Sequence, residues 1–131
     1  MTYEWREHTA EVELAVDADS EEAVFAEAAD ALARLVELDA GGEAASHDVA
    51  LDAPDRPALL VAWLDELVYL ADVEGFVADR VDGLRLRPGG LDATLVGRRT
   101  AIDPIVKAAT YHRLGFEQEG GRWRARVVLD V

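Results

Sequence analysis

The chain has 131 residues, half of them hydrophobic, so one domain with a sizeable buried core is expected over residues 1–131. It contains no cysteine, which excludes disulfides, thiolate zinc sites and a cysteine nucleophile. Its 27 acidic residues outnumber 13 basic ones and give a net charge of −14, which disfavours tight direct binding of nucleic acid. This acidity, with Lys107 as the single lysine, is typical of a halophilic protein, and we interpret it as adaptation to a salt-rich cytoplasm.

The first third of the chain predicts two strands followed by a helix. Residues 3–7 and 11–17 alternate between apolar and polar side chains in the period of a β-strand. Ser20 is a suitable N-cap, and two glutamates follow it at the positive end of the helix dipole. Apolar residues then recur every three or four positions, which predicts an amphipathic helix to about Leu38.

The remaining two thirds predict a strand, a second helix and a run of strands. Residues 46–53 form the strand, and the helix starts at Pro57 and ends at Gly75. The order of elements predicts an α+β fold, a two-layer sandwich with two helices packed on one face of a largely antiparallel (mixed) β-sheet. The core-facing residues of the second helix are Leu60, Trp63, Leu64, Leu67 and Leu70. The last strands are predicted at 76–87, 91–98, 105–114 and 122–130, with glycine-rich turns at "RPGG" and "EGG".

The longest apolar stretch, residues 57–73, is not expected to enter a membrane. It carries Asp65 and Glu66 in its middle, and it is too short and too charged to span a bilayer. The first ten residues are charged and lack the apolar segment of a secretory signal. We therefore expect a cytoplasmic protein with no membrane partner.

The last two residues place two negative groups together, the side chain of Asp130 and the terminal carboxylate of Val131. Such a pair is costly to hold together unless a cation or a basic side chain lies nearby. Glu11, in another predicted strand, would supply a third oxygen donor, and three such donors suit a hard cation such as calcium or magnesium. The alternative is that the chain simply ends here and that Glu11 is a solvated strand residue.

The segment "KAATYH" surrounds the only lysine with other polar groups. Strand alternation places Lys107 and Tyr111 on one face and Thr110 and His112 on the other, so the four side chains do not line a single site. We expect Thr110 and His112 to lie close to the site, whereas Lys107 either approaches the acidic cluster or a partner, or pairs with a neighbouring carboxylate. A lysine kept among arginines indicates that a compact ammonium matters. His8 and His112 remain open as ligands, general bases or packed polar residues.

Five segments occur in order between Glu7 and Val131: "EHTAEVEL", "SEEAVFAEAADAL", "LLVAWLDELVYL", "VKAATYHRL" and "RWRARVVLDV". Taken together, they resemble the archease family. The resemblance implies a small α+β protein that activates the GTP-dependent tRNA-splicing RNA ligase. That ligase joins tRNA halves after guanylylation of its own active-site histidine, and the accessory protein promotes this step and multiple turnover.

The resemblance also implies a calcium-type metal site. In the family it is made by the acid that ends the H-T-A motif, the penultimate Asp and the C-terminal residue, which here are Glu11, Asp130 and Val131. The family's usual acid at the first position is Asp, and the extra methylene of Glu11 moves the carboxylate outward by about 1.5 Å. Calcium tolerates this better than magnesium because its coordination geometry is looser. A second departure is Gly97 followed by Arg98, where the family often has Gly-Glu.

Three functions are therefore open. The sequence has no recognised catalytic motif, so no catalytic residue is assigned. The leading one is a protein cofactor that docks near the nucleotide-binding cleft of the RNA ligase, and the oligomeric state is left open. The second is a metal-dependent hydrolase that uses Glu11, Asp130 and a histidine to activate water. The third is a general chaperone-like module that binds proteins through its acidic surface. The residues expected to contact a partner or support the metal site are His8, Lys107, Thr110 and His112.

Overall fold

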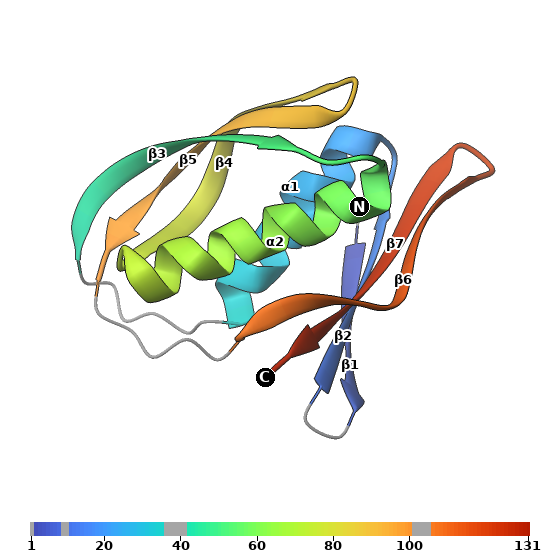
Figure 1. Ribbon diagram of the computed structural model, residues 1–131, viewed down its shortest axis with the longest axis horizontal. Helices are drawn as coiled ribbons and strands as arrows, with labels where there is room; N and C mark the ends of the chain where they lie inside the picture. Colours follow the sequence, from blue (N-terminus) through green and yellow to red (C-terminus); the bar gives the residue numbers. More distant parts are fainter. Residues whose placement is uncertain (1, 9–10, 36–41, 101–105) are drawn as a thin grey trace.

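The structure is a computed structural model that describes residues 2–8, 11–35, 42–100 and 106–131, and these ranges contain seven strands and two helices (Figure 1). In chain order they are β1 (Thr2–His8), β2 (Glu11–Ala18), α1 (Glu21–Leu35), β3 (Glu43–Asp52), α2 (Arg56–Val73), β4 (Phe76–Arg87), β5 (Gly90–Arg99), β6 (Ala108–Glu119) and β7 (Arg122–Asp130).

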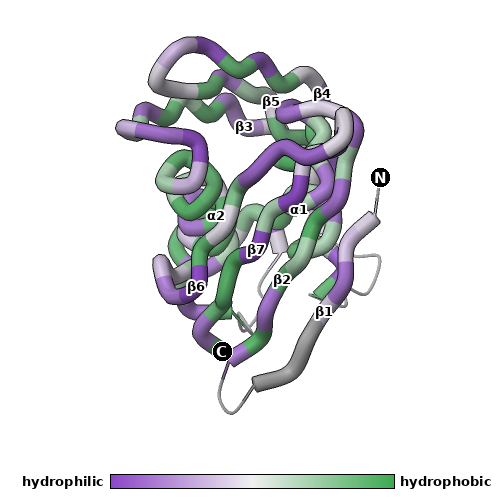
Figure 2. The backbone as a smooth tube through the Cα atoms, turned by 90° about the vertical axis from the view of Figure 1, so that its right-hand side faces the viewer, coloured by the Kyte–Doolittle hydropathy of each residue, from purple (hydrophilic) through white to green (hydrophobic). Residues whose placement is uncertain are grey.

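The strands form two antiparallel sheets, a four-stranded one in the order β1-β2-β7-β6 and a three-stranded one in the order β3-β5-β4. The helices contact strands of both, since α1 packs against β2 and β4 and α2 against β6 and β4 (Figure 1, Figure 2). The predicted α+β class with antiparallel strands is confirmed, and the strands divide between two sheets where the sequence pattern suggested one. Alternation shows which face of a strand is buried, but the choice of neighbours depends on contacts between distant segments.

Both helices begin at capping side chains. The hydroxyl of Ser20 accepts a hydrogen bond of 3.1 Å from the backbone N–H three residues later, which confirms the predicted N-cap of α1. The carboxylate of Asp55 does the same for α2 at 2.8 Å, so this helix starts at Arg56, one residue before the predicted Pro57. Each bond satisfies one of the backbone donors that the first turn of a helix leaves without an intrahelical partner. The predicted end of the first helix near Leu38 lies outside the described residues.

Two strands differ from their predicted bounds by more than one residue at an end. β3 begins at Glu43, before the predicted start at residue 46. β6 runs from Ala108 to Glu119, whereas the predicted strand covered 105–114, of which residue 105 lies outside the described part. The predicted end of the strand is too early because an irregularity in the middle of β6 interrupts the alternation of side chains.

The core lies between the helices and the two sheets, and Trp63 and Phe25 are among its largest fully buried side chains. The indole Nε1 of Trp63 donates to the backbone oxygen of Phe25 at 2.9 Å, which joins α2 to α1 and satisfies a donor that would otherwise be buried without a partner. The predicted core residues of α2 are all buried, namely Leu60, Trp63, Leu64, Leu67 and Leu70. Within the described ranges, neither helix has the length and apolar character that a bilayer crossing requires.

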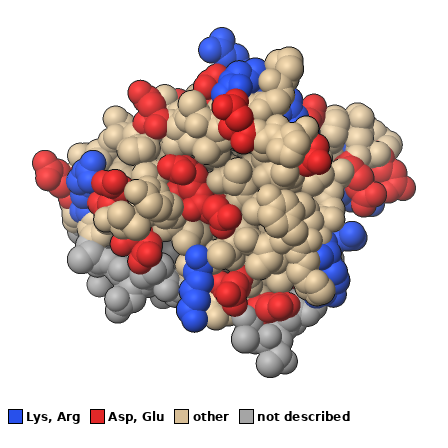
Figure 3. Space-filling view, viewed as in Figure 1, with Lys and Arg blue, Asp and Glu red and all other residues tan. Residues whose placement is uncertain are grey.

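The face that carries α2 is acidic at its centre. Figure 3 shows Asp and Glu side chains over the middle of this face, with Lys and Arg side chains toward its margins. The charge is therefore unevenly distributed, and this face attracts positively charged surfaces.

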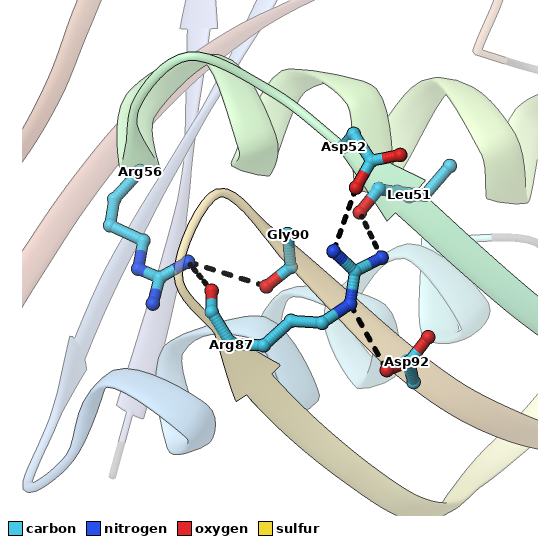
Figure 4. A network of polar contacts seen from close by, with 6 residues as sticks. All are labelled: Leu51, Asp52, Arg56, Arg87, Gly90 and Asp92. Carbon is cyan, nitrogen blue, oxygen red and sulfur yellow. Dashed lines mark hydrogen bonds and ion pairs between the residues drawn. The ribbon is translucent and has the colours of Figure 1, made fainter.

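The turn between β4 and β5 is held by two arginines (Figure 4). Arg87 donates to Asp52 at 2.7 Å, to Asp92 at 3.1 Å and to the backbone oxygen of Leu51 at 3.2 Å. Arg56 donates in turn to the backbone oxygen of Arg87 at 3.1 Å. The hydrogen bond to Asp52 raises the pKa of Arg87, so the guanidinium stays charged. The network fastens the hairpin to β3 and to the start of α2.

Candidate functional site

Glu11 and Asp130 lie side by side at one end of the four-stranded sheet. Glu11 is the first residue of β2, Asp130 is the last residue of β7, and the antiparallel register makes them direct partners. Side chains in such positions share a face, with Cβ atoms about 4.5–5.5 Å apart. Val131 follows immediately, and Figure 2 shows the C-terminus beside the start of β2. We call Glu11, Asp130 and Val131 the acidic tip.

The acidic tip lacks compensation by positive side chains in the part of the chain that the structure describes. There, neither the Glu11 nor the Asp130 side chain makes a hydrogen bond or an ion pair, and Asp130 is exposed whereas Glu11 is half-buried. Like charges directly opposite each other on neighbouring strands are destabilising. A cation bound between the carboxylates would reverse the sign of this interaction, and an all-oxygen donor set suits calcium.

A metal site here needs a donor beyond the side chains of Glu11 and Asp130. Among the described residues, no group of three or more His, Cys, Asp or Glu side chains is placed to hold a metal ion. Glu11 and Asp130 supply two side-chain donors, and the third donor expected from the sequence is the carboxylate of Val131. The donor set fits calcium in chemical type, and the metal site stays a prediction.

Lys107 contributes to the acidic tip through its backbone. Its N–H donates to the backbone oxygen of Asp130 at 2.8 Å, and the next residue, Ala108, is the register partner of Asp130 on β6. The Lys107 side chain is exposed, and no ion pair joins it to a carboxylate within the described ranges. The ammonium is thus available to a partner, while the backbone fixes the end of β7.

Thr110 ends the regular part of β6. Its hydroxyl donates to the backbone oxygen of Val128 at 2.9 Å and lies 3.3 Å from the backbone nitrogen of His112, which donates to it. The register then jumps from Thr110–Val128 to Gly115–Arg126, so residues 111–114 bulge out opposite a single residue of β7. Arg113 in this bulge has a positive φ of 52°.

The bulge overturns the predicted alternation beyond Thr110. Tyr111 was expected on the same face as the buried Ala109, but 66% of its surface is exposed, and His112 is exposed as well. The inserted residues break the period of two on which the face assignment depended. Thr110 is close to the acidic tip in register, two residues from the partner of Asp130, whereas His112 projects from the bulge.

The other predicted histidine, His8, is the last residue of β1, and its backbone pairs with Glu11. Its side chain lies outside the described part of the structure. The topology therefore brings His8, Glu11 and Asp130 into one row across three strands at the level of the backbone.

Asp65 is a residue of this region that the sequence reasoning missed. Its Oδ1 accepts a hydrogen bond of 2.7 Å from the backbone N–H of Ala109, so α2 is fastened to the first residues of β6. In the sequence, Asp65 appeared only as a charge that interrupts an apolar segment. A half-buried acid inside an otherwise apolar helix was the available signal, because such a group needs a hydrogen-bond donor.

Comparison with known proteins gives one consistent family. The model of the Archease protein family matches residues 3–131. Curated relatives named "Protein archease" include one from Methanosarcina acetivorans, 34% identical over 98% of this chain and 95% of its own length. Another, from Methanopyrus kandleri, is 33% identical over the whole of both chains.

Solved structures agree with this result. The solution structure of protein 1598 from Methanobacterium thermoautotrophicum superimposes with a TM-score of 0.72 at 28% identity and covers 98% of both chains. The crystal structure of an archease from Thermotoga maritima, described there as a possible chaperone, gives a TM-score of 0.68 and covers 96% of this chain and 94% of its own. At 23% identity the second likeness supports the fold alone.

Proposed function

The chain belongs to the archease family, and from this premise we propose that it is an accessory activator of the GTP-dependent tRNA-splicing RNA ligase. In this role it promotes guanylylation of the ligase and multiple turnover in tRNA splicing, and the chemical steps stay with the ligase. The observation that carries the proposal is the direct pairing of Glu11 with Asp130 beside the C-terminus. A compact acidic tip at the end of a sheet can enter a cleft that binds nucleotide and metal.

The acidic tip would hold a calcium ion through the carboxylates of Glu11, Asp130 and Val131. When bound, the ion supplies positive charge that offsets the repulsion between these groups. The residues of this chain do the positioning. The Lys107 N–H holds the backbone of Asp130, and Asp65 holds the neighbouring strand through Ala109, so the backbone that carries Asp130 is fixed by hydrogen bonds.

A ligation assay tests the proposal. The ligase would be mixed with a large excess of broken tRNA halves, GTP and metal, with or without this protein, and joined product would be followed over many turnovers. We expect the ligase to stall after about one turnover alone and to continue when the protein is present. If product formation is the same in both cases, the activator role is wrong. Release of phosphate from a simple phosphate ester by this protein alone would instead favour the hydrolase.

A further inference from the structure

One side of α2 carries both apolar and acidic residues, and it is exposed toward the C-terminal end of the helix and half-buried before it. Residues that recur every three or four positions along a helix share a face, because an α-helix has 3.6 residues per turn. On this face Tyr69 is 49% and Val73 is 60% exposed, and apart from Tyr111 they are the large hydrophobic side chains that the described residues expose. We call it the outward face of α2, and it consists of Ala62, Asp65, Glu66, Tyr69, Asp72 and Val73.

The charges on this helix have one sign after its first residue. Of the 18 residues of α2, Arg56 is the only basic one, and Asp65, Glu66 and Asp72 are the acidic ones. Figure 3 shows acidic side chains over the middle of the side of the molecule on which α2 lies. Exposed hydrophobic side chains that lie together and are rimmed by polar ones mark a candidate protein interaction site, and Tyr69 and Val73 lie one helical turn apart.

The outward face of α2 adjoins the acidic tip. Asp65 on this helix bonds the backbone of Ala109, and Lys107, two residues earlier in the chain, bonds the backbone of Asp130. In Figure 1, β6 begins below α2 and close to the C-terminus. A partner that receives the acidic tip therefore meets this face of the helix.

We propose that the outward face of α2 is the surface on which the chain docks to the RNA ligase, with Tyr69 and Val73 as apolar anchors. The inference rests on the proposed function and names the surface that serves it. An enzyme that holds a phosphate backbone needs a basic surface, and the acidic residues beside the anchors complement such a surface. The partner site is an apolar pocket rimmed by Lys and Arg, since buried aromatic side chains carry a large share of interface energy.

Titration of ligase activation separates docking from the action of the acidic tip. Increasing concentrations of wild-type protein, Tyr69→Ala, Val73→Ala and the double variant would be added to the ligase, and the guanylylation rate would be fitted for its maximum and its half-activating concentration. We expect the half-activating concentration to rise roughly tenfold for Tyr69→Ala and further for the double variant, with the maximum rate retained. Val96→Ala is the matched control for Val73→Ala. Val96 is partly exposed and lies on β5 in the three-stranded sheet, whereas the acidic tip lies in the four-stranded one.

The possible results of this titration test the docking surface and the activator role separately. If wild-type protein activates and the double variant gives the same titration curve, the docking surface is wrong and the activator role stands. If wild-type protein does not activate, the proposed function itself is wrong. A photo-crosslinking residue at position 73 of the otherwise unchanged chain gives a second readout that does not depend on the stability of the alanine variants. It should crosslink to the ligase whereas the same residue at position 96 should not, and equal crosslinking from both would overturn the inference.

Discussion

Asp130 stands directly opposite Glu11, across the last register position that β7 shares with β2. Two carboxylates in this arrangement repel each other, and in the described part of the chain neither forms an ion pair with a basic side chain. Sequence and fold therefore maintain an unfavourable pair at a strand end. Such a pair is expected where a cation is bound for function.

Calcium should stabilise the protein through this pair. Added calcium is expected to raise the free energy of unfolding, by about 2.7 kcal/mol when its concentration is a hundred times its Kd. Asp130→Asn should abolish most of this gain and, without calcium, should stabilise the fold by a few tenths to about 1 kcal/mol because the repulsion is gone. Thermal melts with and without calcium measure both effects. Asp82→Asn, at an exposed position of β4, is the control, and equal loss of the calcium effect in both variants would contradict the site.

Asp65 should contribute to stability through Ala109. Asp65→Ala removes the acceptor of the 2.7 Å hydrogen bond and leaves a partly buried N–H without a partner, which costs about 1–3 kcal/mol. Asp65→Asn retains an oxygen at the same place and should cost less. Denaturant unfolding gives the two values, and amide hydrogen exchange at Ala109 shows whether the loss is local. Unchanged exchange at Ala109 in Asp65→Ala would mean that the hydrogen bond does not hold β6.

Glu27 should make stability depend on pH. Burial on α1 raises its pKa, and repulsion by Asp30 adds to the effect. The folded state then holds the proton more tightly than the unfolded state, in which the pKa of a glutamate is about 4.3. The free energy of unfolding therefore falls as the pH rises from the pKa of the unfolded state through that of the folded state. Glu27→Gln removes this loss and should be more stable than the wild type at about pH 7. Urea unfolding of both proteins at neutral pH tests it, and a less stable Gln variant would contradict the assignment.

Gly97 should not tolerate a side chain. A Cβ at this position would overlap the backbone oxygen of Val77 on β4, and backbone cannot move aside as a flexible side chain can. Gly97→Ala should destabilise the fold by roughly 3 kcal/mol or more. In the control Gly115→Ala, the new Cβ lies 3.1 Å from the end of the Arg126 side chain, which can shift, so a small loss is expected. Similar unfolding midpoints for the two variants would contradict the close approach of β4 and β5.

The pairing of β4 with β5 also explains the unusual residue at position 98. Arg98, the residue that departs from the family's Gly-Glu pattern, donates to Asp79 on β4 at 3.1 and 3.2 Å. The exchange of charge is thus matched by an acid on the neighbouring strand. That partner is distant in sequence, and no local pattern connects the two positions.

Local rules predicted what depends on local structure. The Ser20 cap and the buried face of α2 followed from capping chemistry and from the helical period, because both act within a few residues. The bulge at residues 111–114 and the division into two sheets depend on how β6 pairs with β7 and how the helices pack, and neither leaves a periodic signal. The backbone pairing of Glu11 with Asp130 fits the acid set expected from the chain's last residues and its family resemblance. Its use as a metal site stays a prediction.

The most direct measurement is the rate at which the ligase becomes guanylylated in a single turnover. Ligase, labelled GTP and metal would be mixed at high salt with no addition, with wild-type protein, with Asp130→Asn or with Asp82→Asn, and the labelled ligase would be counted over time. We predict acceleration by the wild type and by Asp82→Asn, and its loss with Asp130→Asn. Acceleration that survives Asp130→Asn would contradict the role of the acidic tip, and no acceleration by the wild type would contradict the activator role itself.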